Sequence, residues 1–312
     1  MKKLSYITVL FFCLAALPEK GIAQQYFLND NYYYTPITFE FGGTVGAMNC
    51  LTDLGGKEGV GKQFVKDLNF GSSNVSIGGY FTTMYKSAFG IRFEANFGKV
   101  SAYDSVLSGV PKTDIARTRY YRNLNFQTAI TEYSCVAEIH PLYVFVNYAL
   151  RDQAPPRFSP FLLAGIGFYS YNPQAEINGR LIDLQPLSTE GQGFKEYPDR
   201  QVYKLKQTNI PVGGGFRYDI SPTVKLRGEF VYRILSTDYL DDVSRTYIDP
   251  NLFDKNGLTD AQIYDAKLLY SIPNGSLGIG PGKRRGNPTN NDSYFSFNLK
   301  VGFVLGTQRI RD

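Results

Sequence analysis

The sequence predicts an all-β fold: an eight-stranded antiparallel transmembrane β-barrel with long extracellular loops. Three observations lead to this prediction. Segments of about ten residues alternate between apolar and polar side chains. Long and short connections alternate between these segments. The N-terminus has the composition of an export signal.

The clearest alternation runs from Phe89 to Gly98, where the apolar side chains share one face and the polar side chains share the other. Successive side chains on a strand point to opposite faces, so this pattern is typical of a strand with one apolar surface. A tilted strand of about ten residues can cross a bilayer. Eight segments qualify, and they cover residues 37–47, 75–84, 89–98, 126–139, 159–171, 209–220, 224–234 and 293–305. The pattern leaves the orientation of segment 159–171 open, because it is apolar on both faces.

The lengths of the connections favour a barrel in an outer membrane. Tyr85–Ala88 and Ser221–Thr223 are short, whereas the links 48–74, 99–125, 172–208 and 235–292 are long. This alternation predicts short periplasmic turns, long outer loops and both termini in the periplasm. The middle periplasmic link, 140–158, is longer than a turn, and an extension of the fourth and fifth strands into it would account for its length.

The first residues predict a signal peptide over 1–23. Lys2 and Lys3 precede an apolar run that is too short to span a bilayer comfortably, and cleavage is expected after Ala23. Bulky Phe11 and Phe12 before Cys13 argue against a lipoprotein signal. The predicted mature chain then consists of a periplasmic segment 24–36, the barrel 37–305 and a periplasmic tail 306–312, located in the outer membrane of a Gram-negative cell.

Composition supports the same class. Tyr (24) and Phe (23) are abundant and Trp is absent, which favours strands and membrane–water interfaces. The net charge of +5 is dispersed and argues against nucleic-acid binding. The run Lys283–Arg285 is interpreted as a solvated loop, with contact to anionic lipid headgroups as the alternative. Cys50 and Cys135 are expected to stay unpaired and have no His nearby for a metal site.

The polar faces of the strands carry charges of both signs. A secreted β-sandwich would place such a face in water, but its strands average roughly 5–6 residues. In a narrow barrel the charges would meet inside and neutralise one another, which predicts a filled lumen and not a pore. The predicted interior network consists of Glu40, Arg92, Glu94, Glu132, Glu138, Arg217, Lys225, Arg227, Glu229, Arg233 and Lys300.

The sequence offers little for catalysis or metal binding. His140 is the single histidine and stands at a strand end, where a structural role is commoner than a catalytic one. Asp238, Asp241 and Asp242 form a weak candidate for calcium, although their spacing is not that of an EF-hand. Gly213–Gly215 lies within a strand, so it is not a phosphate loop. We expect no enzyme activity, no cofactor and no small-molecule substrate.

Five strings resemble one family: Tyr121-Arg-Asn-Leu-Asn-Phe126, Phe161-Leu-Leu-Ala-Gly-Ile-Gly167, Leu184-Gln-Pro-Leu-Ser-Thr-Glu-Gly-Gln-Gly193, Thr237-Asp-Tyr-Leu-Asp-Asp-Val-Ser244 and Arg285-Gly-Asn-Pro-Thr-Asn-Asn-Asp292. In this order they resemble the PorG-like outer-membrane barrels of the type IX (Por) secretion system.

The resemblance covers about residues 37–305, with one departure at Ser293, where an aromatic residue is expected. It implies a barrel that sits in outer-membrane lipid and anchors or positions a periplasmic ring of the lipoprotein PorK and of PorN. The implied partner surface is periplasmic and comprises residues 24–36, the short turns, the link 140–158 and the tail 306–312. The alternative is a general structural or adhesive outer-membrane barrel, similar to the membrane domain of OmpA, that acts through its extracellular loops.

Overall fold

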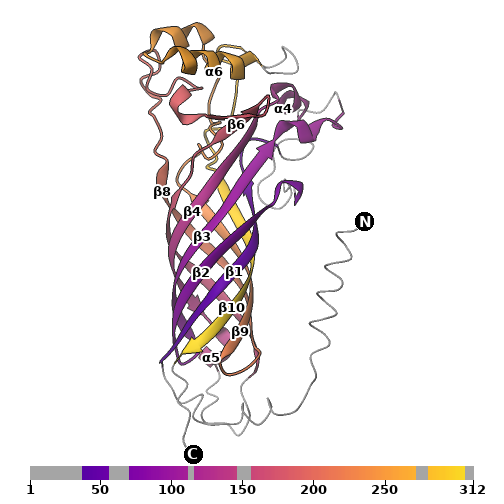
Figure 1. The fold of residues 1–312 in the computed structure, drawn as a ribbon, viewed down its shortest axis with the longest axis vertical. Coiled ribbons are helices and arrows are strands. Elements are labelled where there is room, and N and C mark those ends of the chain that lie inside the picture. Colours follow the sequence, from indigo (N-terminus) through magenta and orange to yellow (C-terminus); the bar gives the residue numbers. More distant parts are fainter. Residues whose placement is uncertain (1–36, 56–69, 112–115, 146–155, 272–279, 306–312) are drawn as a thin grey trace, which may run out of the picture.

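The computed structural model describes residues 37–55, 70–111, 116–145, 156–271 and 280–305. The predicted signal peptide with its cleavage after Ala23, the segment 24–36 and the tail 306–312 lie outside the described residues. A tall barrel carries a folded layer of loops over one end (Figure 1).

Eight long strands form the barrel wall: β1 (Ile37–Leu51), β2 (Asn74–Tyr85), β3 (Phe89–Tyr103), β4 (Asn125–Ile139), β5 (Phe158–Ser170), β8 (Lys206–Asp219), β9 (Val224–Leu235) and β10 (Ser293–Leu305). Each strand pairs antiparallel with the next wall strand along the chain, and β1 pairs with β10 to close the ring. The predicted eight-stranded antiparallel barrel is confirmed.

The barrel has a short-turn end and a long-loop end. Ile37 and Leu305, where the described barrel begins and ends, lie at the short-turn end with α5 (Pro141–Phe145) (Figure 1). The β2–β3 connection there is a tight turn in which Lys86 and Ser87 both have positive φ, 50° and 55°. Two successive left-handed residues give a hairpin loop whose twist matches the strands beside it.

The fourth strand does not extend into the link 140–158, and the fifth reaches only its last residue, Phe158, so strand extension does not account for the described part of the link. β4 ends at Ile139, as predicted, and the α5 turn follows directly. Pro141 opens this turn, because proline cannot donate to a strand ladder but fits the first position of a helix. The Tyr143 hydroxyl donates to the Pro156 carbonyl at 3.1 Å and ties the start of the link to its end.

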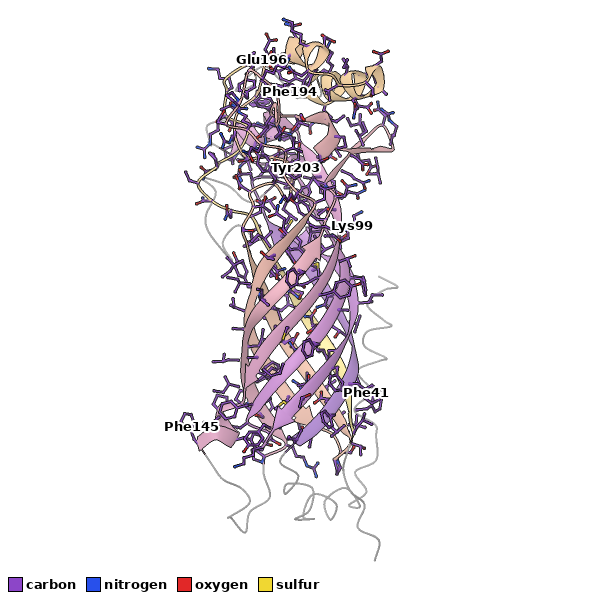
Figure 2. All side chains as sticks on the ribbon, turned by 90° about the vertical axis from the view of Figure 1, so that its left-hand side faces the viewer. Phe41, Lys99, Phe145, Phe194, Glu196 and Tyr203 are labelled. Atoms are coloured by element: carbon purple, nitrogen blue, oxygen red, sulfur yellow. The ribbon has the colours of Figure 1, made fainter. Side chains whose placement is uncertain are left out.

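Several strands are longer than predicted at the long-loop end. β1 continues to Leu51, β3 to Tyr103, and β8 begins at Lys206. Polar side chains such as Lys99 replace the apolar ones there, so the alternation that marks the strand lower down is lost. Figure 2 places Lys99 near the upper rim of the barrel.

Apolar side chains cover the outer surface of the barrel below this rim. Leu162, Phe168 and Leu299 are about 60% exposed, and Phe41 points outward (Figure 2). The outward set includes Phe39, Phe41, Val45, Ile77, Phe81, Ile91, Phe93, Phe97, Tyr133, Ile210, Phe216, Ile234, Phe297, Val301 and Phe303. A sandwich hides its apolar face in a core, whereas this single closed sheet presents it outward. The belt is therefore the surface of a membrane-type barrel.

The same surface fixes the orientation of β5, which the sequence left open. Phe158, Leu162 and Phe168 point outward, whereas Ser159 and Phe161 are buried in the lumen. Both cysteines among the described residues are free: Cys50 is buried near the top of β1, and Cys135 lies in β4.

A layer that we call the cap covers the long-loop end, and it consists of the described residues between strands there. It contains the hairpin β6 (Gln174–Ile177) and β7 (Arg180–Asp183), the helices α4 (Arg117–Arg122) and α6 (Asp260–Ser271), and the 3-10 turns η2 (Phe70–Ser72), η3 (Asp104–Leu107), η5 (Gln185–Leu187) and η6 (Pro250–Lys255). All of these elements lie in stretches that the sequence predicted to be loops. Among the described helices, none is long and apolar enough to cross a membrane.

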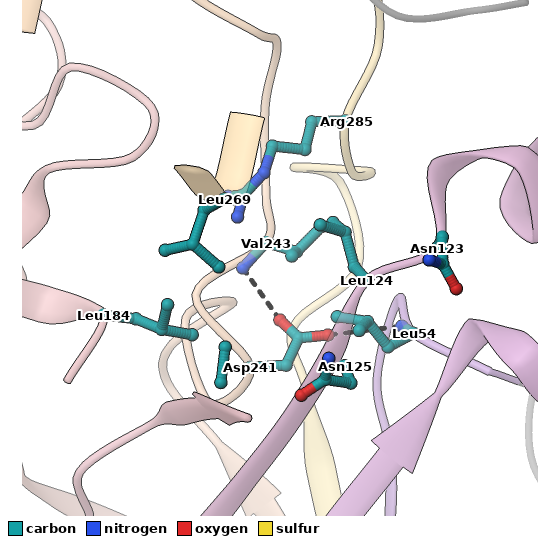
Figure 3. Close-up of a pocket in the computed structure, with 10 residues that line it drawn as sticks. Leu54, Asn123, Leu124, Asn125, Leu184, Asp241, Val243, Leu269 and Arg285 are labelled. Carbon is teal, nitrogen blue, oxygen red and sulfur yellow. Dashed lines mark hydrogen bonds between the residues drawn. The ribbon is translucent and has the colours of Figure 1, made fainter. Parts of the chain in front are cut away.

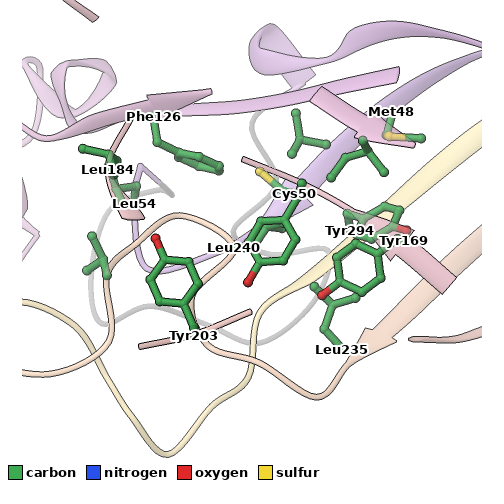
Figure 4. Packing of buried hydrophobic residues seen from close by; sticks show 14 of the residues in the cluster. Met48, Cys50, Leu54, Phe126, Tyr169, Leu184, Tyr203, Leu235, Leu240 and Tyr294 are labelled. Atoms are coloured by element: carbon green, nitrogen blue, oxygen red, sulfur yellow. The ribbon is translucent and has the colours of Figure 1, made fainter. Parts of the chain in front are cut away.

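Two hydrophobic clusters hold the cap together. The lower cluster joins the strand tops to the cap and contains Met48, Phe126 and Tyr294 together with Leu240 and Tyr203 from the loops (Figure 4). The upper cluster packs α6 and η6 against the β6–β7 hairpin, around residues Ile182, Phe194, Ile248, Phe253 and Ala266. The cap is therefore a folded layer with its own core and is continuous with the barrel.

Candidate functional site: the filled lumen and the cap

All eleven side chains of the predicted interior network are buried in the lumen, with exposed fractions of 7% or less. They come from β1, β3, β4, β8, β9 and β10, because alternate residues on these strands point inward. Sequence analysis missed a twelfth member, Asp219. Its position two residues after Arg217 in the same strand places it on the same face, so the alternation could have identified it.

Two arginines occupy the centre of the network. Arg227 contacts Glu40 at 2.8 Å and Glu138 at 2.9 Å. Arg92 contacts Glu138 at 2.7 Å and Glu229 at 2.9 Å. Each guanidinium thus bridges strands on different sides of the barrel, which suits its planar fork of donors.

Further ion pairs extend the network. Lys300 contacts Glu229 at 2.9 Å and also pairs with Glu94. Arg233 contacts Glu132 at 3.1 Å. Asp219 accepts from Lys225 at 2.6 Å and lies 3.2 Å from Arg217. The lumen therefore balances six carboxylates against six cations.

Tyr80 lies among the central charges. Its hydroxyl donates to Glu40 at 2.6 Å. Arg92, Arg227 and Lys300 all lie within 6 Å of its ring centroid, at 5.9, 5.7 and 5.1 Å. A ring face attracts cations, so Tyr80 stabilises the three positive groups where water is excluded.

Apolar side chains fill another part of the lumen. Val136, Phe161, Leu163 and Val231 form a buried cluster between the walls, and the Phe161 ring also faces Arg227 at 5.6 Å. An eight-stranded barrel is only wide enough to be filled by side chains. Ion pairs and apolar side chains together occupy the interior of this one.

His140 is completely buried near the short-turn end. Its Nδ1 lies 3.1 Å from the Ser159 hydroxyl and its Nε2 lies 3.6 Å from Glu138. Serine, histidine and carboxylate stand in the order of a hydrolytic triad. However, Ser159 and His140 have no exposed surface, and Arg92 and Arg227 already bind Glu138. The group joins β4 to β5 and offers no face to a substrate.

Glu190 is the centre of the first polar cluster in the cap. It accepts from the backbone N–H groups of Ser244 at 3.0 Å and Arg245 at 2.9 Å, and from Arg285 at 3.1 Å. Arg285 also reaches the carboxylate of Asp242. In the run Lys283–Arg285, the first two residues are exposed, whereas Arg285 is buried in this cluster. The solvated-loop interpretation is therefore wrong for Arg285.

Arg122 is the centre of the second polar cluster. It binds both carboxylate oxygens of Asp104, at 2.8 and 2.9 Å. It also donates to the backbone carbonyls of Asp53 and Arg285. One buried guanidinium thus joins three connections: the one between β3 and β4, which holds both Arg122 and Asp104, the one after β1 and the one before β10.

Four of the five family-like strings meet in the cap. Arg122 belongs to the first, Glu190 to the third, Asp242 to the fourth and Arg285 to the fifth, and these residues contact one another as described. The remaining string, 161–167, lies in β5 of the barrel wall. The strings therefore serve to fold the long-loop end and do not mark the short-turn end.

The structure does not support the calcium hypothesis. Asp242 accepts from Tyr203 at 2.8 Å and binds Thr189, whereas Asp241 accepts from the N–H groups of Leu54 and Val243. Asp238 is buried as well, and neither of its carboxylate oxygens makes a hydrogen bond among the described residues. No three acidic, His or Cys side chains among the described residues form a group that could hold a metal ion.

A small cavity lies where the cap meets the strand tops (Figure 3). It is lined by residues that include Leu124, Asn125, Leu184, Asp241 and Arg285. Its volume of about 10 Å³ has room for about one water molecule. This cavity is too small for an organic ligand.

Searches of protein-family models and of curated proteins find no match. Among solved structures, the chain is similar to Ail of Yersinia pestis, with 8% identity over 86% of this chain and 97% of that chain and a TM-score of 0.34. It is similar to Neisserial surface protein A, with 9% identity over 85% and 96% of the two chains and a TM-score of 0.34.

A third similar structure is the outer membrane protein OprG from Pseudomonas aeruginosa, with 10% identity over 86% and 95% of the two chains and a TM-score of 0.34. The sequence identities and TM-scores of these three similarities are low. The barrel architecture rests on the strand pairing described above, and no site or partner is carried over from them.

Proposed function

We propose that this protein is a non-conducting, non-enzymatic scaffold of a Gram-negative outer membrane. One observation carries the proposal: an apolar belt surrounds a lumen that ion pairs and apolar side chains fill. Exposed aliphatic and aromatic side chains over the height of a barrel suit hydrocarbon and not water. A filled lumen leaves the two ends as the surfaces on which the protein can act.

Planar-bilayer recording tests the absence of a pore. The purified protein should give no steady channel conductance, because the lumen residues neutralise one another and exclude a water path. Reproducible single-channel steps from the purified barrel, absent from a heat-denatured sample, would contradict the proposal.

On the family resemblance, we further propose that the scaffold belongs to type IX secretion and holds the periplasmic PorK and PorN ring at its short-turn end. Short turns suit the periplasmic side and long loops the cell exterior. A specific feature supports contact at that end: Phe145 in α5 is 84% exposed, beside partly exposed Leu142 and Val144 (Figure 2). An exposed aromatic side chain of this kind is typical of an interface.

The alternative is a structural or adhesive barrel that acts through its outer loops. The folded cap favours this alternative, because a core of its own gives the loops a fixed surface. Tyr264 on α6 is 63% exposed on that surface.

A matched pair of variants separates the two proposals. If the ring docks at the short-turn end, Phe145→Ser should reduce cross-linking to PorK and PorN in isolated outer membranes, and Tyr264→Ser should leave it unchanged. Capture of surface ligands that only Tyr264→Ser weakens, with no ring subunit recovered, would favour the adhesive role. Deleting the gene should abolish export of type IX cargo, and normal export would contradict the secretion role.

A further inference from the structure

Hydrogen bonds bring together the segments of four aspartates at the base of the cap, because the Leu54 N–H beside Asp53 donates to Asp241 and the Leu240 N–H donates to Asp292. We call them the carboxylate cluster: Asp53, Asp238, Asp241 and Asp292. Three of them are buried, with exposed fractions of 8% for Asp238, 0% for Asp241 and 3% for Asp292. Each of these three feels the negative charge of other members of the cluster. Asp53 follows β1 in the chain, Asp238 and Asp241 follow β9, and Asp292 precedes β10.

The carboxylate cluster ties these segments together through backbone donors. Asp241 accepts from the Val243 N–H at 2.9 Å and from the Leu54 N–H at 3.3 Å (Figure 3). Asp292 accepts from the Leu240 N–H at 2.8 Å. These bonds connect the loop after β9 to the tops of β1 and β10.

The groups that face the carboxylate cluster do not neutralise it. Arg122 from α4 and Arg284 act on Asp53, at the edge of the cluster. Arg285 is engaged with Glu190 and Asp242, and Glu190 adds a further negative charge near Asp238. The other polar neighbours are uncharged groups and include the hydroxyls of Thr52 and Ser244. The Cys50 thiol lies near Asp241 and Asp292, and the hydroxyls of Tyr169 and Tyr171 lie near Asp292.

Asp238 is the member whose charge is least compensated. Its two oxygens are buried, and neither makes a hydrogen bond of acceptable geometry among the described residues, although the Ser244 hydroxyl lies near. An ionised carboxylate in such a place carries a large desolvation cost, and neutralisation by a proton removes it. Burial and the neighbouring carboxylates raise the pKa of Asp238 to about 8 and those of Asp241 and Asp292 well above the usual range.

We propose that the carboxylate cluster is a proton-operated latch, which holds the cap closed over the barrel when its members are protonated and loosens the cap when they ionise. The geometry supplies the mechanism: ionisation places like charges beside one another in a buried space, and the nearby loops can relieve the repulsion by moving into water. This inference does not depend on the proposed partner.

The direction of the pH dependence follows from the raised pKa values. A cluster with raised pKa values binds protons more tightly in the closed cap than in the open one, so acid favours closure. The stabilisation is complete below the usual aspartate pKa near 4, and Asp238 loses its share as the pH rises through about 8. The cap should therefore be closed in mildly acidic surroundings and looser in alkaline ones.

Hydrogen–deuterium exchange on the purified full-length protein in detergent tests the latch. Protection of the amide groups would be compared at pH 5.5 and 8.5. The unfolded protein, measured at the same two pH values, supplies the correction for the intrinsic exchange rate. Peptides that contain Leu54, Leu240 and Val243 report on the latch, and residues 297–303 of β10 serve as the barrel control. We expect protection in the latch peptides to fall by about tenfold or more at the higher pH, the change that one pKa unit produces, with the barrel peptide unchanged.

Two variants make the test specific. Asp238→Asn keeps the shape but cannot ionise, so it should reduce the fall in protection severalfold. Asp260→Asn alters an exposed aspartate at the start of α6 and should behave like the native protein. If Asp238→Asn fails to fold, Asp292→Asn replaces it with the same expectation.

Three outcomes would overturn the latch. Protection that is equal at the two pH values in the native protein would do so. A fall in Asp238→Asn and in Asp292→Asn that is as large as in the native protein would do so as well. Recovery of protection at pH 8.5 on addition of calcium alone would show that the carboxylate cluster binds a metal cation and is not governed by protons.

Discussion

The lumen and the cap both bury charged side chains, but they compensate them differently. In the lumen every carboxylate of the network contacts a cation, and Arg92, Arg227 and Lys300 each contact more than one. At the base of the cap, the negative charges of Asp238, Asp241 and Asp292 act on one another, and none of the three forms an ion pair with a cation among the described residues.

This difference matches the surroundings of the two regions. The wall of the barrel separates its lumen from lipid, and no water is at hand to solvate an unpaired charge, so pairing has to be built in. The cap lies beyond the apolar belt, where its loops can move and let water reach a charge. We infer that the lumen is a permanent structure and that the cap is adjustable.

The largest effect should come from removing the central cation of the lumen. Arg227→Met would leave Glu40 and Glu138 without a principal partner, which we expect to cost about 3–5 kcal/mol of the free energy of unfolding. Urea unfolding of the barrel, followed by its gel shift between folded and unfolded forms, measures this. Lys99→Met, on the outer face, is the control, and an equal loss in both variants would argue against the central role of Arg227.

The next effect concerns the cap alone. Arg285→Met would remove the cation shared by Glu190 and Asp242, and we expect a loss of about 1.5–3 kcal/mol in local cap stability. Hydrogen exchange in residues 236–245 should rise while exchange in β3 stays as it is. Faster exchange in β3 as well would show that the cap and the barrel unfold as one unit.

A smaller effect is expected at Asp238, and it has the opposite sign. Because its raised pKa penalises ionisation in the closed cap, Asp238→Asn should stabilise the cap by about 1 kcal/mol at pH 8.5 and hardly at all near pH 4. The measurement is protection of the Leu240 amide at several pH values. Destabilisation at pH 8.5 would mean that the charged carboxylate contributes favourably.

The smallest effect should come from an ion pair on the surface of the cap. Lys267 contacts Asp254 at 2.6 Å, but both side chains are more than 40% exposed. Exposed pairs contribute roughly 0–1 kcal/mol, so Lys267→Gln should leave cap protection within error of the native value. A loss as large as that of Arg285→Met would show that burial does not set the strength of these pairs.

The sequence by itself determined the barrel. Period-two alternation located all eight wall strands, and the inward positions identified eleven of the lumen charges, because a strand's side chains alternate wherever one face meets lipid. The alternation of apolar and polar side chains weakens above the apolar belt, where neither face of the strand meets lipid. It stopped short of Tyr103 in β3 and of Lys206 in β8, because side chains above the belt meet water or the cap on both faces.

Only the tertiary structure decided the cap. The sequence shows Asp238, Asp241 and Asp242 as one acidic stretch, which offered only a weak calcium candidate, and Lys283–Arg285 as one basic stretch, which was interpreted as a solvated loop. In the folded chain Arg285 contacts Glu190 and Asp242. Asp241 instead accepts from the Leu54 N–H beside Asp53, and Asp292 accepts from the Leu240 N–H beside Asp241. These partners lie tens to hundreds of residues apart, and no local periodicity encodes which loops meet. Lipid imposes a repeating pattern on each strand separately, whereas the cap is specified by contacts that exist only after the strands have brought its loops together.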